Sequence, residues 1–160
     1  MTANGCGCAH ECMPAGVIFA KMNSEIKRQS LLKFLIIACI ASTAIHFTDN
    51  YLDFEHYPQP DWITPSSIVR SWSIWTVTGI AGYWLYKNKW YWSSYLCLAY
   101  YSFCGLSSLA HYLYGPMSEF SAKMHLFIAT DALTGSAILG FALLSGLILR
   151  EQFKARGAAG

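Results

Sequence analysis

Four long apolar segments, separated by short polar or proline-containing stretches, constrain this 160-residue chain more than any other feature. A helix needs roughly 20 mainly apolar residues to cross the hydrocarbon core of a bilayer. The segments that meet this requirement are 31–47, 68–86, 90–114 and 124–149. Charged residues make up only 12% of the chain, against roughly 25% in soluble domains. The sequence therefore predicts an all-α fold, an integral membrane bundle of four transmembrane helices.

The predicted organisation has a leader, a membrane domain and a tail. Residues 1–30 form a leader that contains Cys and His, with an amphipathic stretch at 20–30 expected on the membrane surface. Residues 150–160 form the tail. The membrane domain is 31–149, with helices at about 31–50, 65–86, 90–114 and 122–149. Thr64 followed by Pro65 is typical of a helix start, with the proline at the first helical position.

The basic residues predict the orientation of the bundle. Nine of the eleven Lys and Arg fall on one side of the four-span arrangement: Lys21, Lys27, Arg28, Lys33, Lys87, Lys89, Arg150, Lys154 and Arg156. Only Arg70 and Lys123 fall toward the other side. Because basic residues stay on the cytoplasmic side, we expect a multi-pass protein with both termini in the cytoplasm. A net charge of +2 without a dense basic stripe excludes nucleic acid as a partner. The expected partners are the lipid bilayer and other membrane subunits or further copies of this chain.

Small residues predict close helix packing. Ala132, Ser136 and Gly140 recur every four residues in the last segment. Such a stripe lets two helix backbones approach closely in lipid. We expect it to contribute to packing within the bundle.

Histidines gather near the outer ends of three predicted helices. His46, His111 and His125 come to a similar depth on the first, third and fourth helices. Asp131 lies six residues beyond His125, which is about 9 Å deeper at 1.5 Å per residue. Because ionisable side chains are costly inside a membrane, these residues are candidates for a functional site.

The first helix carries the densest polar pattern. His46, Asp49, Asn50 and Asp53 have the spacing i, i+3, i+4, i+7, which places them on one helix face. His and Asp one turn apart can offer a nitrogen and an oxygen to one metal ion, as in di-iron bundles. We therefore expect His46, Asp49, His111 and His125 to bind a transition metal (Fe, Cu or Zn).

Three further interpretations remain open for the same residues. In the first, two of the histidines His46, His111 and His125 ligate a haem for a redox or metal-handling role. In the second, they line a pocket for a lipophilic small molecule, with acid–base, isomerase-like chemistry in which Asp131 and Asp53 relay protons. In the third, the chain is a non-catalytic accessory subunit of a larger membrane complex.

Aromatic side chains supply walls for such a pocket. The candidates lie in the second and third segments: Trp72, Trp75, Thr76, Tyr100, Tyr101 and Cys104. Trp and Tyr combine a flat apolar face with a polar tip. They are equally typical of the interface between membrane and water, so both interpretations stay open.

The leader contains a second group of metal-binding residue types. Cys6, Cys8, His10 and Cys12 place three thiols and an imidazole within seven residues. Thiolates with one imidazole suit Zn or Cu(I). The alternation differs from the usual C-x-x-C spacing, and palmitoylation near the membrane is an alternative.

The layout of residues 31–149 resembles the EXPERA group of four-helix membrane proteins, which includes sterol isomerases and sigma-2-type receptors. The resemblance consists of four short spans, His46 and Asp49 at the exit of the first span, and Tyr57 and Pro58 in the first loop. It implies an intramembrane pocket for a lipophilic ligand. The intramembrane acidic residues of that group have no position-by-position match here, so the resemblance concerns the type of pocket.

Overall fold

The chain folds as a set of antiparallel helices. The computed structural model describes residues 15–153, and their side chains from residue 22 onward. The long helices are α1 (Ala15–Leu52), α2 (Pro65–Lys87), α3 (Tyr91–Leu106) and α4 (Ala122–Leu143). Within the described range there is no strand, so the predicted all-α fold is confirmed. The Cys6, Cys8, His10 and Cys12 group lies outside the described residues.

Short helical segments join or extend the long helices. Three are 3-10 helices: η1 (Phe54–His56), η2 (Ser107–Leu113) and η3 (Met117–Glu119). The fourth, η4 (Leu144–Ile148), is a π-helix that continues α4. The predicted third span at 90–114 therefore changes from α-helix to 3-10 helix partway along.

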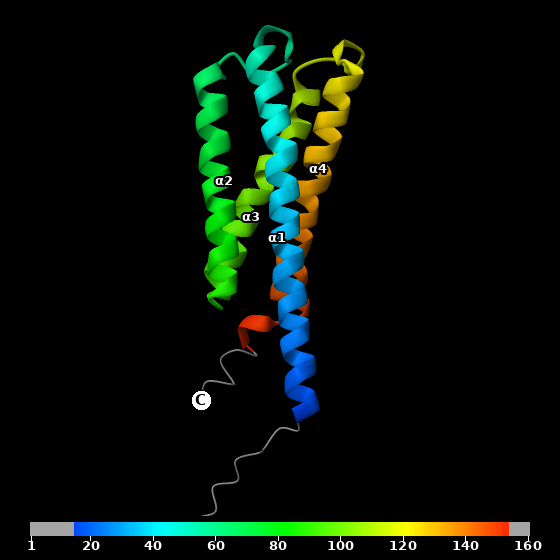
Figure 1. Cartoon of the computed structure of the whole chain (residues 1–160). Helices are drawn as coiled ribbons and strands as arrows, with labels where there is room; N and C mark the ends of the chain where they lie inside the picture. Colours follow the sequence, from blue (N-terminus) through cyan, green and yellow to red (C-terminus); the bar gives the residue numbers. More distant parts are fainter. Residues whose placement is uncertain (1–14, 154–160) are drawn as a thin grey trace, which may run out of the picture.

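The four long helices surround a common core. α1 packs against α2 and α4, and α3 packs against the same two helices. The start of α1, the α2–α3 turn and the segment after η4 lie at one end of the bundle, which we call the terminal end (Figure 1). The α1–α2 and α3–α4 connections lie at the opposite end, which we call the loop end. The core between them includes Leu32, Ile36, Leu98, Tyr101 and Ile138.

α1 is longer than its neighbours. Its 38 residues correspond to about 57 Å of helix at 1.5 Å per residue. Residues 20–30, expected on the membrane surface, belong to α1 and continue its axis (Figure 1).

The start of α2 follows the prediction from its sequence. Thr64 is the N-cap, Pro65 opens the helix, and the Thr64 hydroxyl accepts a hydrogen bond from the backbone of Ser67. The Ser67 side chain reciprocates with the Thr64 backbone, which completes a capping box. The predicted helix start at residue 65 is confirmed.

Two helices are long and apolar enough to span a membrane. They are Met22–Leu52 and Ala122–Ile148. By the same measure of length and composition, α2 and α3 are not candidates among the described residues. α3 has only 16 residues, which is short for a span, whereas Trp, Tyr, Ser and Arg70 lower the hydropathy of α2. The all-helical fold is therefore confirmed, whereas for membrane spanning the structure offers two candidate helices and does not confirm four spans.

Glycine brings α3 and α4 into backbone contact at a different position from the one predicted. A Cβ atom on Gly135 would lie 2.7 Å from the Ser102 carbonyl oxygen, and one on Gly105 would collide with the Asp131 carbonyl. A Cβ atom on Gly140 would meet no atom of the described residues within 4 Å. Gly140, part of the predicted small-residue stripe with Ala132 and Ser136, thus lies on the outside of the bundle.

Candidate functional site

A buried histidine–aspartate pair joins α1 to α4 near the loop end. His46 Nδ1 lies 2.8 Å from Asp131 Oδ2, with His46 1% exposed and Asp131 fully buried. Asp131 also accepts hydrogen bonds from Ser108 at 3.0 Å and from Ser42. A buried carboxylate needs such donors, because an unpaired charge in an apolar environment is strongly unfavourable. The structure thus brings together two of the residues singled out in the sequence.

Local packing explains how these two side chains meet. Asp131 lies one turn after Ile128 and one turn before Gly135 on the inner face of α4, and all three are buried. The glycine contact holds the end of α3 against this part of α4, so that Ser108 in η2 reaches the carboxylate. On α1, His46 follows the buried residue Thr43 at helical spacing.

A second histidine lies beside this pair. The rings of His111 and His46 have centroids 5.5 Å apart. His111 Nδ1 donates to the Pro58 carbonyl oxygen at 2.7 Å, because a carbonyl can only accept. In the neutral ring Nε2 is therefore the basic nitrogen of His111. His46 Nε2 is buried and has no hydrogen-bond partner in the part of the chain that the structure describes.

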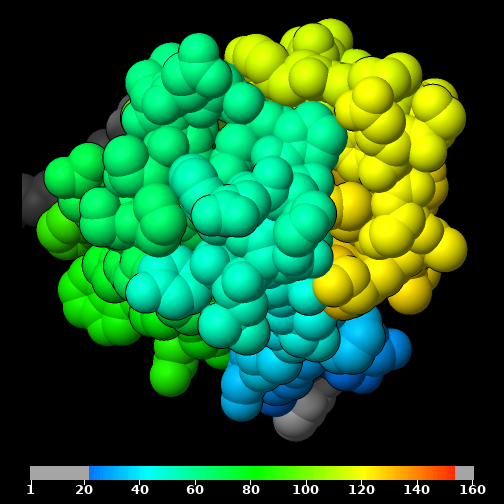
Figure 2. Space-filling model, turned by 90° about the horizontal axis from the view of Figure 1, so that it is seen from above, coloured from blue at the N-terminus to red at the C-terminus, as the bar shows by residue number. Residues whose placement is uncertain are grey.

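The α1–α2 loop closes over the two histidines. Tyr57 is buried, its ring lies 5.7 Å from that of His46, and its hydroxyl donates to Asp49 Oδ2 at 2.6 Å. Burial and the Asp49 carboxylate raise the pKa of the Tyr57 phenol, which therefore remains a donor. Lys123 donates to the other Asp49 oxygen at 2.7 Å. Figure 2 shows residues near 50–60 (cyan) between α2 (green) and the start of α4 (yellow) at the loop end.

Other predicted site residues lie apart from this pair. His125 Nδ1 pairs with the Tyr112 hydroxyl at 2.7 Å, and the two rings stack. Asp53 is partly exposed, with a side chain 42% accessible, and pairs with His56 at 2.7 Å. Asp49 is held by Tyr57 and Lys123. Among the described residues, no group of three or more His, Cys, Asp or Glu side chains is placed to hold one metal ion.

A cavity of about 250 Å³ opens next to His111. It lies between α1, the α1–α2 loop, α2 and η2, and its walls are mainly apolar. The residues that line it are Phe47, Asn50, Gln59, Pro60, Trp62, Ile63, Ser67, Ile68, Ser71, Trp75, Ser107, Ala110, His111 and Tyr114. Of the aromatic residues considered for a pocket wall, Trp75 lines this cavity, whereas Tyr100 is 50% exposed. We call this space the His111 cavity.

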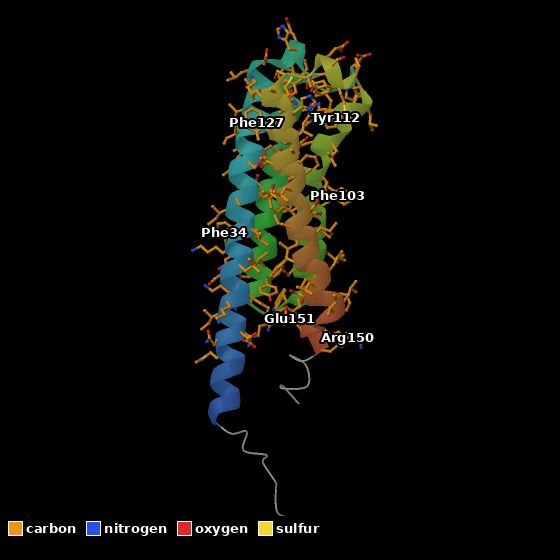
Figure 3. All side chains as sticks on the ribbon, turned by 90° about the vertical axis from the view of Figure 1, so that its right-hand side faces the viewer. Phe34, Phe103, Tyr112, Phe127, Arg150 and Glu151 are labelled. Atoms are coloured by element: carbon orange, nitrogen blue, oxygen red, sulfur yellow. The ribbon has the colours of Figure 1, made fainter. Side chains whose placement is uncertain are left out.

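A second polar cluster fixes the terminal end. Glu151 is buried and forms an ion pair with Arg28 at 2.7 Å. It also accepts hydrogen bonds from Tyr86 at 2.8 Å and Tyr95 at 3.1 Å. Arg150, with φ of 50°, turns the chain so that Glu151 reaches inward. Figure 3 shows Glu151 far from Tyr112 and Phe127, so this cluster is separate from the histidine site and joins four parts of the chain.

Sequence reasoning missed the hydroxyl donors of Asp131. Ser42 lies four residues before His46, and Ser108 lies three residues before His111. Both are therefore one helical turn from a candidate histidine, and this spacing was the available signal. No protein-family model, curated protein or solved structure matches the chain.

Proposed function

We propose that this protein is a multi-pass membrane protein that binds a small lipophilic molecule in the His111 cavity and exchanges protons with it. The main support for this proposal is the cavity itself. It is lined by His111, whose ring centroid lies 5.5 Å from that of His46 in the buried His46–Asp131 pair. An apolar pocket with a few polar groups is the usual form of a small-molecule site.

The outer surface supports four membrane-spanning helices. Large apolar side chains are exposed on α2 and α3 as well as on the two span candidates. On these two helices they are Val69, Ile74, Val77, Ile80, Trp84, Trp92, Leu96, Tyr100 and Phe103. An apolar exterior of this extent is unfavourable in water and suits lipid. With η2 included, α3 also extends over a length comparable to α2.

Charge distribution supports cytoplasmic termini. Arg28, Lys87, Lys89 and Arg150 belong to the terminal end, together with the described ends of the chain (Figure 1). The loop end carries Asp49, Asp53, Glu55, Asp61 and Glu119. By the positive-inside rule, the terminal end faces the cytoplasm.

The proposed chemistry uses His111 as the group that touches the bound molecule. Its Nε2 accepts a proton from the molecule and returns it at another position, as in an isomerisation. Asp131 binds His46, whose ring lies beside that of His111, and its negative charge stabilises the resulting imidazolium. In this proposal Asp131 stabilises charge, whereas the sequence suggested that it relays protons, and Asp53 lies outside this arrangement.

Blocking the cavity tests this proposal. Ala110 lines the cavity, so Ala110→Phe should fill it, while Val77→Phe adds similar bulk on the exposed face of α2. Compounds extracted from the purified proteins are compared by mass spectrometry. We expect a small molecule in wild type and Val77→Phe that is absent from Ala110→Phe. Identical extracts from all three would favour the accessory-subunit interpretation.

Transition-metal binding is a second candidate, favoured by the hydrogen bonds of the two neighbouring histidines. His46 and His111 each have Nδ1 paired with an oxygen and Nε2 left over. Metal-ligating histidines are typically anchored in this way. With only two protein ligands, the remaining ligands would be water or the bound molecule. Haem fits less well, since the cavity volume is below the roughly 300–1,000 Å³ of sites for drug-sized ligands.

Metal analysis separates the two candidates. Stoichiometric Fe, Cu or Zn in the purified protein, lost in His111→Ala and kept in His125→Ala, would support a metal role. His125 is a suitable control because it pairs with Tyr112 away from His46. Metal content that does not depend on His111 would leave the acid–base proposal as the better account.

A further inference from the structure

Two of the residues that line the His111 cavity carry a buried polar atom without a hydrogen-bond partner in the described part of the chain. Asn50 Oδ1 and Trp75 Nε1 are both buried and have no hydrogen-bond partner among residues 22–153. Asn50 as a whole is 7% exposed, and both residues line the cavity. A buried polar group without a partner costs about 1–3 kcal/mol. One atom is an acceptor and the other is a donor, so a ligand group that donates once and accepts once would satisfy both.

The cavity wall disfavours a charged ligand. No Asp, Glu, Lys or Arg is among the described residues that line it. The buried Asp131 carboxylate already accepts from His46, Ser42 and Ser108. A cation or anion entering the half-open cavity would lose part of its hydration without gaining a charged partner, which is unfavourable. The ligand should therefore be neutral.

The volume of this half-open cavity limits the part of a ligand that it can enclose. About 250 Å³ corresponds to roughly eight water molecules at ~30 Å³ each. Phe47, Trp62, Trp75 and Tyr114 supply flat aromatic walls. Such a space suits a molecule of one or two rings, and it is smaller than the sterol frame implied by the resemblance to sterol isomerases.

We infer that the ligand of the His111 cavity is an uncharged compound of one or two rings that carries a hydroxyl group. Its hydroxyl donates to Asn50 Oδ1 and accepts from Trp75 Nε1. Its rings pack among the aromatic walls, within reach of His111. This inference rests on the proposed function, and it names the substrate class for the same site.

Three probes of matched shape test this inference. They are 1-indanol, indane and 1-aminoindane, which carry a hydroxyl, no polar group and a cationic amine on the same two-ring frame. Binding is measured by equilibrium dialysis against the full-length protein in lipid nanodiscs, with empty nanodiscs subtracted. We expect 1-indanol to bind about tenfold tighter than indane, because two buried polar atoms gain partners. We expect 1-aminoindane to bind more weakly than 1-indanol.

Matched variants assign the preference to the two residues. In Asn50→Leu and Trp75→Phe the advantage of 1-indanol over indane should shrink severalfold, whereas indane binding should persist. The controls Asn23→Leu and Trp84→Phe change the same residue types at exposed positions outside the cavity and should keep the preference. Equal binding of 1-indanol and indane, or tighter binding of the amine, would overturn the inference and leave the pocket intact. Binding of no probe would overturn the pocket itself.

Discussion

Replacing Asp131 by Asn removes the charge that holds the loop end together. The Asp131 carboxylate accepts from His46, Ser108 and Ser42. An amide keeps one accepting oxygen, so at least one donor loses its acceptor and the others lose a charged partner. Losing a hydrogen bond to a charged group costs about 1.5–3 kcal/mol. With two weakened bonds in addition, the free energy of unfolding should fall by about 3–4 kcal/mol, in line with other broken buried pairs.

A double-mutant cycle isolates the contribution of His46. Asp131→Asn, His46→Gln and the double variant are compared by SDS-induced unfolding in mixed micelles. We expect a coupling free energy of about 1.5–2 kcal/mol, above the ~0.6 kcal/mol average for hydrogen bonds between membrane helices. Coupling at or below that average would refute the reasoning, since it would mean that the His46–Asp131 pair is no stronger than an ordinary hydrogen bond between helices.

Further predictions concern positions around the site and at the terminal end. Gly105→Ala should lower the free energy of unfolding by about 1–3 kcal/mol through overpacking, because its Cβ would collide with a backbone carbonyl, whereas Gly140→Ala should have little effect in the same SDS titration. Tyr57→Phe should cost about 1 kcal/mol through its lost hydrogen bond. The pKa of Tyr57 is raised in the folded state, so the stability that its hydroxyl contributes should be fully present below the usual phenol pKa of about 10 and be lost at more alkaline pH. Thermal unfolding of wild type and variant across this pH range would show it. Glu151→Gln should weaken the ion pair at the terminal end and speed proteolysis of the tail. Adding Gln152→Glu should not restore the ion pair, because the Gln152 side chain donates to the Gly146 carbonyl and a carboxylate there would meet an acceptor.

Features set by local chemistry could be predicted from the sequence. The start of α2 follows from Thr64 and Pro65, whose capping geometry depends only on neighbouring residues. The all-helical fold follows from the length and apolar character of the segments. Which helices are span candidates was harder to predict, because the α-helical part of the third segment is short and because polar and aromatic residues lower the hydropathy of α2.

For the site, only the position of its residues along the length of the bundle could be predicted from the sequence. Helical rise places His46, His111 and His125 at similar depth, yet it does not fix the rotation of each helix. The structure turns His46 and Asp131 toward each other, while His125 pairs with Tyr112. Rotation depends on long-range packing, here the contact of Gly105 with the backbone of α4, which no local pattern in the sequence encodes.

Deuterium uptake by the bound molecule tests the central claim most directly. The purified protein with its bound compound is incubated in D₂O, the compound is extracted into ordinary water to remove exchangeable deuterium, and its mass is measured. Proton transfer by His111 predicts carbon-bound deuterium in wild type and in His125→Ala, and none in His111→Gln. A compound without carbon-bound deuterium in wild type, or with equal uptake in His111→Gln, would contradict the account.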